Sequence, residues 1–122
     1  MATGTSIVGT WNLVVDWGCG GSPINGLPMT FKSDGTWTYV YGGGRWFQVE
    51  GMATWTFTNA PGLSYSGNVT ADAVLGLMGY TSNPPNPGTG CFYMTRGTAK
   101  AAAEAAKAAP KGADPLVGPK KK

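Results

Sequence analysis

Residues 7–17 read Ile-Val-Gly-Thr-Trp-Asn-Leu-Val-Val-Asp-Trp, and this stretch decides the fold. Every second position of it carries a large apolar side chain, from Ile7 to Trp17, except Gly9. The same period of two recurs in residues 54–58, where threonines alternate with Trp55 and Phe57. A period of two places alternate side chains on one face of a strand. The pattern therefore predicts strands that each have one buried face.

Short turn signals separate these runs, at Asp34-Gly35, at the glycines 42–44 and at residues 59–62. They divide the chain into eight predicted strands, near residues 6–17, 27–33, 36–41, 45–50, 53–58, 63–69, 73–80 and 90–96. No connection is long enough for the helix that a parallel crossover needs. We therefore predict an all-β fold, a closed eight-stranded antiparallel up-and-down barrel.

The only two cysteines bear on closure of this barrel. Cys19 follows the first predicted strand and Cys91 begins the last. In a closed barrel these strands are antiparallel neighbours, so both cysteines fall on the same rim. They could form a disulfide, bind a metal or remain thiols, although two sulfurs without a histidine make a poor zinc site. We expect a structural pair.

The same register places Trp11 near Arg96. The triplet Gly9-Thr10-Trp11, together with an arginine late in the last strand, resembles the calycin superfamily of lipocalins, fatty-acid-binding proteins and avidins. The resemblance covers two short motifs and the strand count over residues 5–97. It implies a calycin-like barrel in which Trp11 and Arg96 are structural and close the floor, with the arginine over the indole ring.

The aromatic side chains give the main functional signal. Five of them on the predicted inner face could line a ligand: Trp17, Trp37, Tyr39, Trp55 and Phe57. Such an interior can hold a small apolar or planar ligand, but in a barrel this small the same rings can also simply fill the core. We favour a non-enzymatic binding protein that holds a small hydrophobic or aromatic ligand between these five side chains.

The alternative is a barrel with a filled core that acts through its surface. Trp46 falls on the opposite face of its predicted strand, with Gln48 and Glu50, and an exposed tryptophan marks a contact surface. The longer connections, 18–26 and 81–89, lie at one rim. This alternative predicts a protein-interaction module that uses Trp46 and the rim loops.

Composition argues against an enzyme. The chain has no histidine, which excludes histidine-dependent triads and imidazole metal sites. The acidic residues before residue 98 show no spacing that suggests general acid/base work, and neither cysteine has a visible base. We expect no catalytic residue, no metal and no cofactor.

Composition changes at residue 98. Residues 1–97 carry three basic and four acidic side chains, whereas residues 98–122 carry six lysines and two acids. The second segment is rich in alanine and proline and has almost nothing to bury, so we predict a barrel domain over 1–97 and a disordered, flexible tail over 98–122. Its Ala/Lys stretch, ending in Lys120–Lys122, resembles the tails of bacterial histone-like proteins. A net charge of +4 supports only weak, salt-dependent contact with anionic surfaces, so we expect no specific nucleic-acid partner.

No apolar run approaches the roughly 20 residues of a membrane-spanning helix. Residues 1–6 contain neither a basic region nor an apolar core, from which we expect no export signal and a cytoplasmic location. A reducing compartment would favour free thiols at Cys19 and Cys91. We also expect a monomer.

Overall fold

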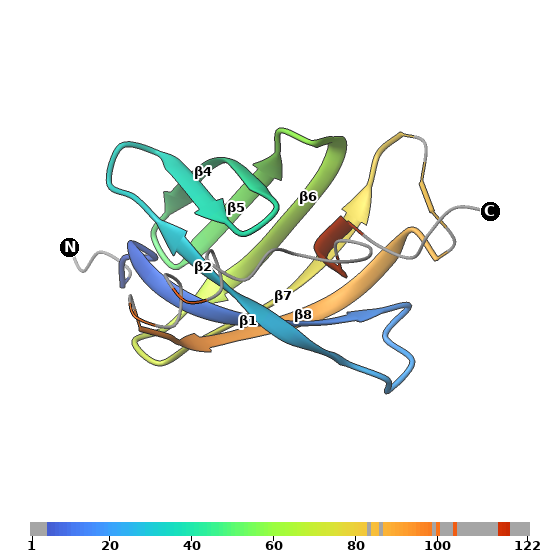
Figure 1. Ribbon diagram of the computed structural model, residues 1–122, viewed down its shortest axis with the longest axis horizontal. Helices are drawn as coiled ribbons and strands as arrows, with labels where there is room; N and C mark the ends of the chain where they lie inside the picture. The colour runs from blue at the N-terminus through green and yellow to red at the C-terminus, as the bar shows by residue number, and fades with distance from the viewer. Residues whose placement is uncertain are drawn as a thin grey trace.

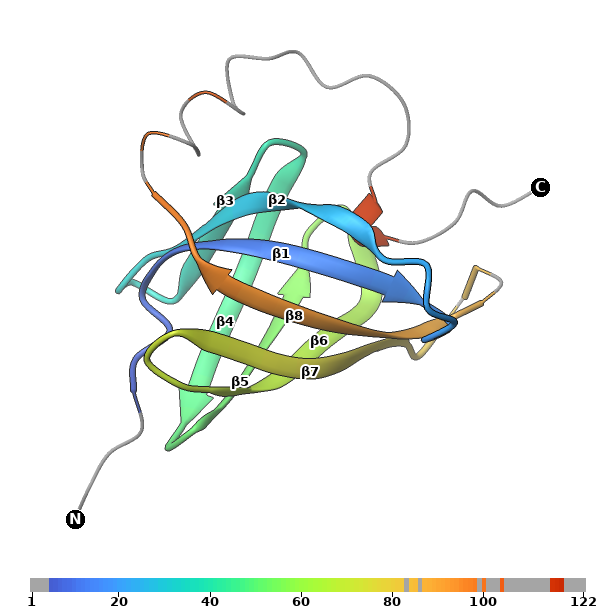
Figure 2. The same cartoon turned by 90° about the horizontal axis from the view of Figure 1, so that it is seen from below.

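The computed structural model describes residues 5–82, 84–85, 87–98, 100, 104 and 115–117. Its elements in chain order are β1 (Gly9–Trp17), β2 (Ile24–Phe31), β3 (Thr36–Tyr39), β4 (Gly42–Val49), β5 (Met52–Phe57), β6 (Ala60–Val69), β7 (Ala73–Tyr80), β8 (Thr89–Arg96) and the 3-10 turn η1 (Pro115–Val117). Each strand pairs antiparallel with the next, and β8 pairs with β1 (Figures 1 and 2). The predicted closed eight-stranded antiparallel barrel is therefore confirmed.

The barrel closes along the seam between β1 and β8, which lie side by side in Figure 2. Trp11 stands opposite Arg96, and Trp17 stands opposite Gly90. Just beyond the end of β1, Cys19 forms a disulfide with Cys91, with 5.3 Å between the two Cα atoms. The seam is thus fixed by main-chain pairing along its length and by a covalent link near one end.

We call the end of the barrel at which β1 begins the floor and the opposite end the mouth. At the floor, the guanidinium carbon of Arg96 lies 3.8 Å from the centre of the Trp11 ring. The indole N–H of Trp11 donates to the carbonyl oxygen of Ile7 (2.8 Å). Gly9 has a φ of +130°, and a Cβ there would lie 2.9 Å from an Arg96 nitrogen. Glycine two residues before the tryptophan therefore makes room for the arginine.

Replacing Arg96 with alanine is expected to lower the free energy of unfolding by about 1–2 kcal/mol. The change removes the cation–π contact and the hydrogen bonds from the guanidinium to the carbonyl oxygens of Ser6, Val8 and Ala71. Urea unfolding followed by circular dichroism measures the loss. Arg45→Ala, on the exposed side of β4, is the matched control and should cost less than about 0.5 kcal/mol; equal losses in the two variants would contradict this role for Arg96.

The glycines 42–44 lie in β4, whereas the sequence predicts a turn there. The turn consists of Val40 and Tyr41, and Gly44 pairs with Trp37 of β3. A Cβ on Gly44 would collide with the carbonyl oxygen of Thr56 in β5. The glycine therefore serves a close approach of neighbouring strands rather than a bend in the chain.

Trp46 is also placed differently from the prediction. It stands directly opposite the buried Trp55 and is half-buried, and its indole N–H donates to the carbonyl oxygen of Lys32 (2.9 Å). Gln48 shares this inward face because its side-chain amide bonds the backbone of residues 5 and 7 at the floor. The polar appearance of these positions therefore does not mark the outer face. The exposed aromatic side chain of β4 is Phe47, at 62 %.

The predicted tail, residues 98–122, lies mostly outside the described residues. The exceptions are Thr98, Lys100, Glu104 and η1. At η1 the expectation that this segment has almost nothing to bury is wrong, because Leu116 is fully buried in the hydrophobic core.

Candidate ligand site at the mouth of the barrel

Three of the side chains predicted to line a ligand lie in the centre of the barrel. Trp37, Trp55 and Phe57 are all buried. Trp37 meets Phe57 edge-on with 4.8 Å between ring centres, and Trp55 meets Phe31 and Phe92 edge-on at 5.1 and 5.4 Å. Edge-to-face pairs at these distances are the preferred aromatic geometry. At this level the protein's own rings occupy the interior.

The two buried indole groups differ in their hydrogen bonds. The N–H of Trp37 donates to the carbonyl oxygen of Thr56 (3.0 Å). The N–H of Trp55 is buried and has no hydrogen-bond partner among the described residues. A buried donor without an acceptor costs about 1–3 kcal/mol. The indole N–H of Trp55 is therefore a buried donor without an acceptor among the described residues.

The other two predicted residues, Trp17 and Tyr39, lie nearer the mouth. Both are half-buried and pack against the core. Trp17 lies against Tyr80 of β7, with 6.1 Å between ring centres, and Tyr39 lies 5.0 Å from Trp37. These rings continue the central aromatic cluster outward toward the mouth. The five predicted residues therefore belong to two levels of the barrel rather than to one ring around a ligand.

A segment distant in sequence enters the barrel at this end. In Figure 1 the red turn η1 lies beside β6, toward the mouth. Leu116 is 0 % exposed and belongs to the hydrophobic core cluster, and Val117 packs against the same cluster. The barrel therefore accommodates an aliphatic side chain that its own wall does not supply.

Two tyrosines bind the backbone of this segment. The hydroxyl of Tyr65, a fully buried residue of β6, donates to the carbonyl oxygen of Leu116 (2.6 Å). The hydroxyl of Tyr80, in β7, donates to the carbonyl oxygen of Val117 (2.5 Å). The Tyr65 ring stacks on Trp55 at 5.7 Å between centres and 20° between planes. The mouth thus combines an apolar wall with two hydroxyl donors that point at consecutive carbonyl groups.

This pairing of one buried aliphatic side chain with two tyrosine donors is the most specific arrangement in the described structure. No protein-family model, curated protein or solved structure matches the chain. What is known of the mouth is therefore its own contacts, namely the burial of Leu116 and the two tyrosine hydrogen bonds.

The residues predicted from sequence to line the ligand site do not include Leu116, Val117, Tyr65 or Tyr80. One signal was available, since Leu116 and Val117 are the only leucine and valine in residues 98–122. Two adjacent aliphatic side chains in a segment otherwise made of alanine, glycine, proline, charged residues and one threonine indicate something to bury.

The two predicted rim loops do meet at the mouth. The backbone N–H of Gly18 donates to the carbonyl oxygen of Thr89 (2.7 Å), and the N–H of Thr81 donates to the carbonyl oxygen of Gly62 (2.8 Å). The disulfide joins the first loop to β8 beside these bonds. These contacts hold the β1–β2 and β7–β8 connections to the barrel at the same end as η1.

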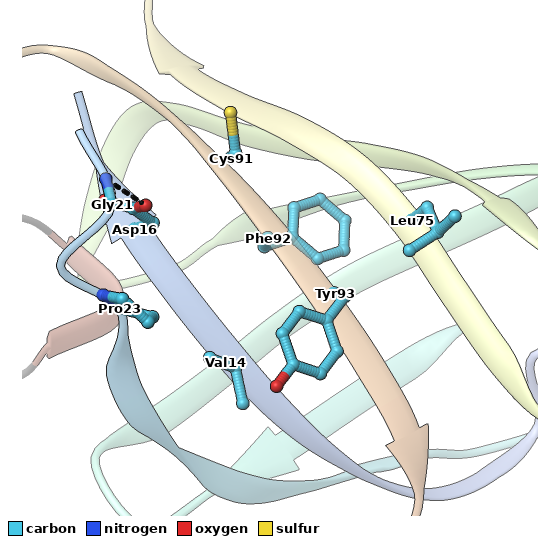
Figure 3. A pocket seen from close by; sticks show the side chains of 8 residues that line it. All are labelled: Val14, Asp16, Gly21, Pro23, Leu75, Cys91, Phe92 and Tyr93. Atoms are coloured by element: carbon cyan, nitrogen blue, oxygen red, sulfur yellow. Dashed lines mark hydrogen bonds between the residues drawn. The ribbon is translucent and has the colours of Figure 1, made fainter. Parts of the chain in front are cut away.

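A hollow of about 350 Å³ lies on the outer wall beside the seam (Figure 3). Its apolar side is a row across three adjacent strands, formed by Val14, Tyr93 and Leu75. The β1–β2 loop forms the other side and is fixed by the carboxylate of Asp16, which accepts hydrogen bonds from the backbone N–H groups of Gly20 (3.2 Å) and Gly21 (2.9 Å). The hollow is therefore preformed, but it offers no donor pair like that of the mouth among its described lining residues.

Other kinds of site receive no support from the described ranges. Within them no three cysteine, aspartate or glutamate side chains gather as they would around a metal ion. No helix among the described residues has the length and apolar character to cross a bilayer. The predicted anionic contact through Lys120–Lys122 lies outside the described residues.

Proposed function

We propose that the protein is a non-enzymatic binding protein whose ligand site is the mouth of the barrel, with a compact hydrophobic or aromatic group as the ligand. The observation that carries the proposal is the complete burial of Leu116, an apolar side chain that the strands of the barrel do not supply. Trp17 packs against Tyr80, whose hydroxyl bonds Val117, and Tyr39 packs against Trp37. Leu116, Trp37, Trp55 and Phe57 all belong to the same buried core cluster. Burial of apolar area against aromatic walls is the ordinary source of affinity in such sites.

Titration of the full chain with the neutral apolar probe N-phenyl-1-naphthylamine is expected to change tryptophan fluorescence in a saturable way. Replacing Tyr39 with alanine removes one of the aromatic side chains near the mouth and should weaken probe binding about tenfold, because the loss of an aromatic contact of about 1 kcal/mol adds to the loss of buried apolar area. Tyr93→Ala is the matched control, since Tyr93 lies on the outer wall and is 45 % exposed. It should leave the affinity unchanged.

Two results would overturn this assignment. One is the absence of any saturable signal, both in the natural chain and in a Leu116→Asp variant designed to empty the mouth. The other is a loss of affinity in Tyr93→Ala alone, because that result would place the probe in the outer hollow.

A second candidate function is protein interaction through the outer wall. Leu75 and Leu77 of β7 are 64 % and 65 % exposed, and Tyr93, which pairs with Leu75 on the adjacent β8, is 45 % exposed. Exposed apolar side chains that gather on one wall mark contact surfaces. In this candidate the contact residues are the outer side chains of β7 and β8, and not Trp46, which is half-buried.

The calycin resemblance also belongs to the proposal. It is supported by the strand order and by the position of Arg96 over Trp11. A cytoplasmic location and a monomeric state remain predictions. The disulfide between Cys19 and Cys91 argues against the cytoplasmic location, because disulfides persist in oxidising compartments.

A further inference from the structure

The segment at the mouth is bound as a ligand would be bound. Leu116 contributes a buried aliphatic side chain, and the carbonyl oxygens of Leu116 and Val117 accept hydrogen bonds from the barrel. Both donors belong to the barrel wall, one on β6 and one on β7, and both acceptors belong to the segment. The mouth therefore contacts a branched aliphatic side chain and two carbonyl oxygens next to it.

We propose that the mouth binds peptide segments of this chemistry, an aliphatic residue whose own backbone carbonyl and that of the next residue both accept hydrogen bonds, and that Pro115–Val117 is the built-in competitor for them. The proposal rests on the function proposed above, because it specifies the class of ligand for the same site. A peptide from a partner would have to displace η1 and take over the hydroxyls of Tyr65 and Tyr80. The chain's own segment then keeps the mouth filled when no such partner is present.

The length of the connection fits this role. β8 ends at the floor with Arg96, whereas η1 lies toward the mouth, and residues 98–114 join them. A connection of this length reaches about 55 Å when fully extended, and the wall along the nine residues of β1 is about 30 Å tall. The link is therefore long enough to let η1 occupy the mouth and to let it leave.

The covalent link also predicts how strongly the segment competes. A tethered group faces its site at an effective concentration on the order of 1 mM. If the free peptide binds the emptied mouth with a Kd of about 10 µM, the natural chain should bind it about 100-fold more weakly.

The test uses the full chain and the acetylated, amidated hexapeptide Ala-Asp-Pro-Leu-Val-Gly, which copies residues 113–118. In a Leu116→Asp variant a carboxylate cannot stay in the buried position, so η1 should leave the mouth. This variant is expected to bind the peptide at least tenfold more tightly than the natural chain, as measured by tryptophan fluorescence and by calorimetry. Leu77→Asp makes the same change on the exposed outer wall and should bind the peptide as the natural chain does.

The hydroxyl of Tyr80 provides a readout specific to the carbonyl contact. Tyr80→Phe, introduced together with Leu116→Asp, removes one hydrogen bond and should weaken peptide binding about fivefold. Binding of N-phenyl-1-naphthylamine, which has no carbonyl group, should be unchanged by the same substitution.

The outcomes separate the two proposals. If the emptied mouth binds N-phenyl-1-naphthylamine but not the peptide, the mouth is a site for small apolar molecules and the peptide proposal is overturned. If the peptide binds the natural chain and the Leu116→Asp variant equally well, Pro115–Val117 is not its competitor. If the emptied mouth binds neither probe, the function proposed above fails as well.

Discussion

Trp55→Ala is expected to destabilise the barrel by about 4 kcal/mol, the upper range for truncating a large buried side chain. Trp55 is fully buried and touches the rings of Phe31, Tyr65 and Phe92, so its removal leaves a cavity between three rigid neighbours. Small domains have a total stability of about 5–15 kcal/mol. The variant should therefore unfold at a much lower urea concentration, and near-ultraviolet circular dichroism would show the loss of fixed aromatic packing.

Trp55→Phe provides the control for this effect. Phenylalanine keeps an aromatic ring in the site and removes the indole N–H, which has no hydrogen-bond partner among the described residues. The loss of ring area and the removal of an unpaired donor oppose each other, so the net change should be below about 1.5 kcal/mol. A loss as large as that of Trp55→Ala would show that the position tolerates only an indole ring. The N–H would then require a partner.

Loss of the disulfide is expected to have an effect of similar size. Cys19 and Cys91 are 72 residues apart in sequence, and a cross-link that closes a loop of that length stabilises the folded state by about 4 kcal/mol in the chain-entropy model. Paired replacement of Cys19 and Cys91 by serine should therefore lower the free energy of unfolding by about that amount. Urea unfolding of the variant and of the oxidised natural chain measures the difference.

Unfolding of the natural chain in the presence of a reductant separates the cross-link from the serine side chains. The reduced chain and the double variant should have the same midpoint within error. If the reduced natural chain is as stable as the oxidised chain, the main-chain pairing of β1 with β8 is sufficient to hold the seam, and the entropic account is wrong for this barrel.

Much of the fold follows from local pattern. The alternation in residues 7–17 predicts β1 and its inward side chains. In a strand with one buried face, apolar side chains recur at every second position, because successive side chains point to opposite faces. Closure could be predicted because a barrel of eight antiparallel strands makes the first strand a neighbour of the last. Two residue pairs join the first and last strands as this closure requires: Cys19 with Cys91, and Trp11 with Arg96.

The remaining features depend on contacts that local pattern does not encode. On β4 the polar side chain of Gln48 lies on the same inward face as Trp46, and its amide bonds the N-terminal segment at the floor. The glycines of β4 resemble a turn in sequence, although close approach of the neighbouring strands requires them. The buried position of Leu116 also depends on a contact between residues that are far apart in sequence. Nothing near it in sequence indicates which cavity will receive it, and its partner Tyr65 is 51 residues away.

The seam between β1 and β8 has a consequence for the route by which the chain folds. Seven of the eight strand pairs join neighbours along the chain, but this pair joins its two ends. Bringing such distant partners together carries a loop-closure cost, and proteins rich in such non-local contacts fold in milliseconds to seconds rather than microseconds. Until the seam forms, both outer strands have unpaired backbone groups that can pair with another chain. Refolding at high protein concentration should therefore favour aggregates over the closed barrel.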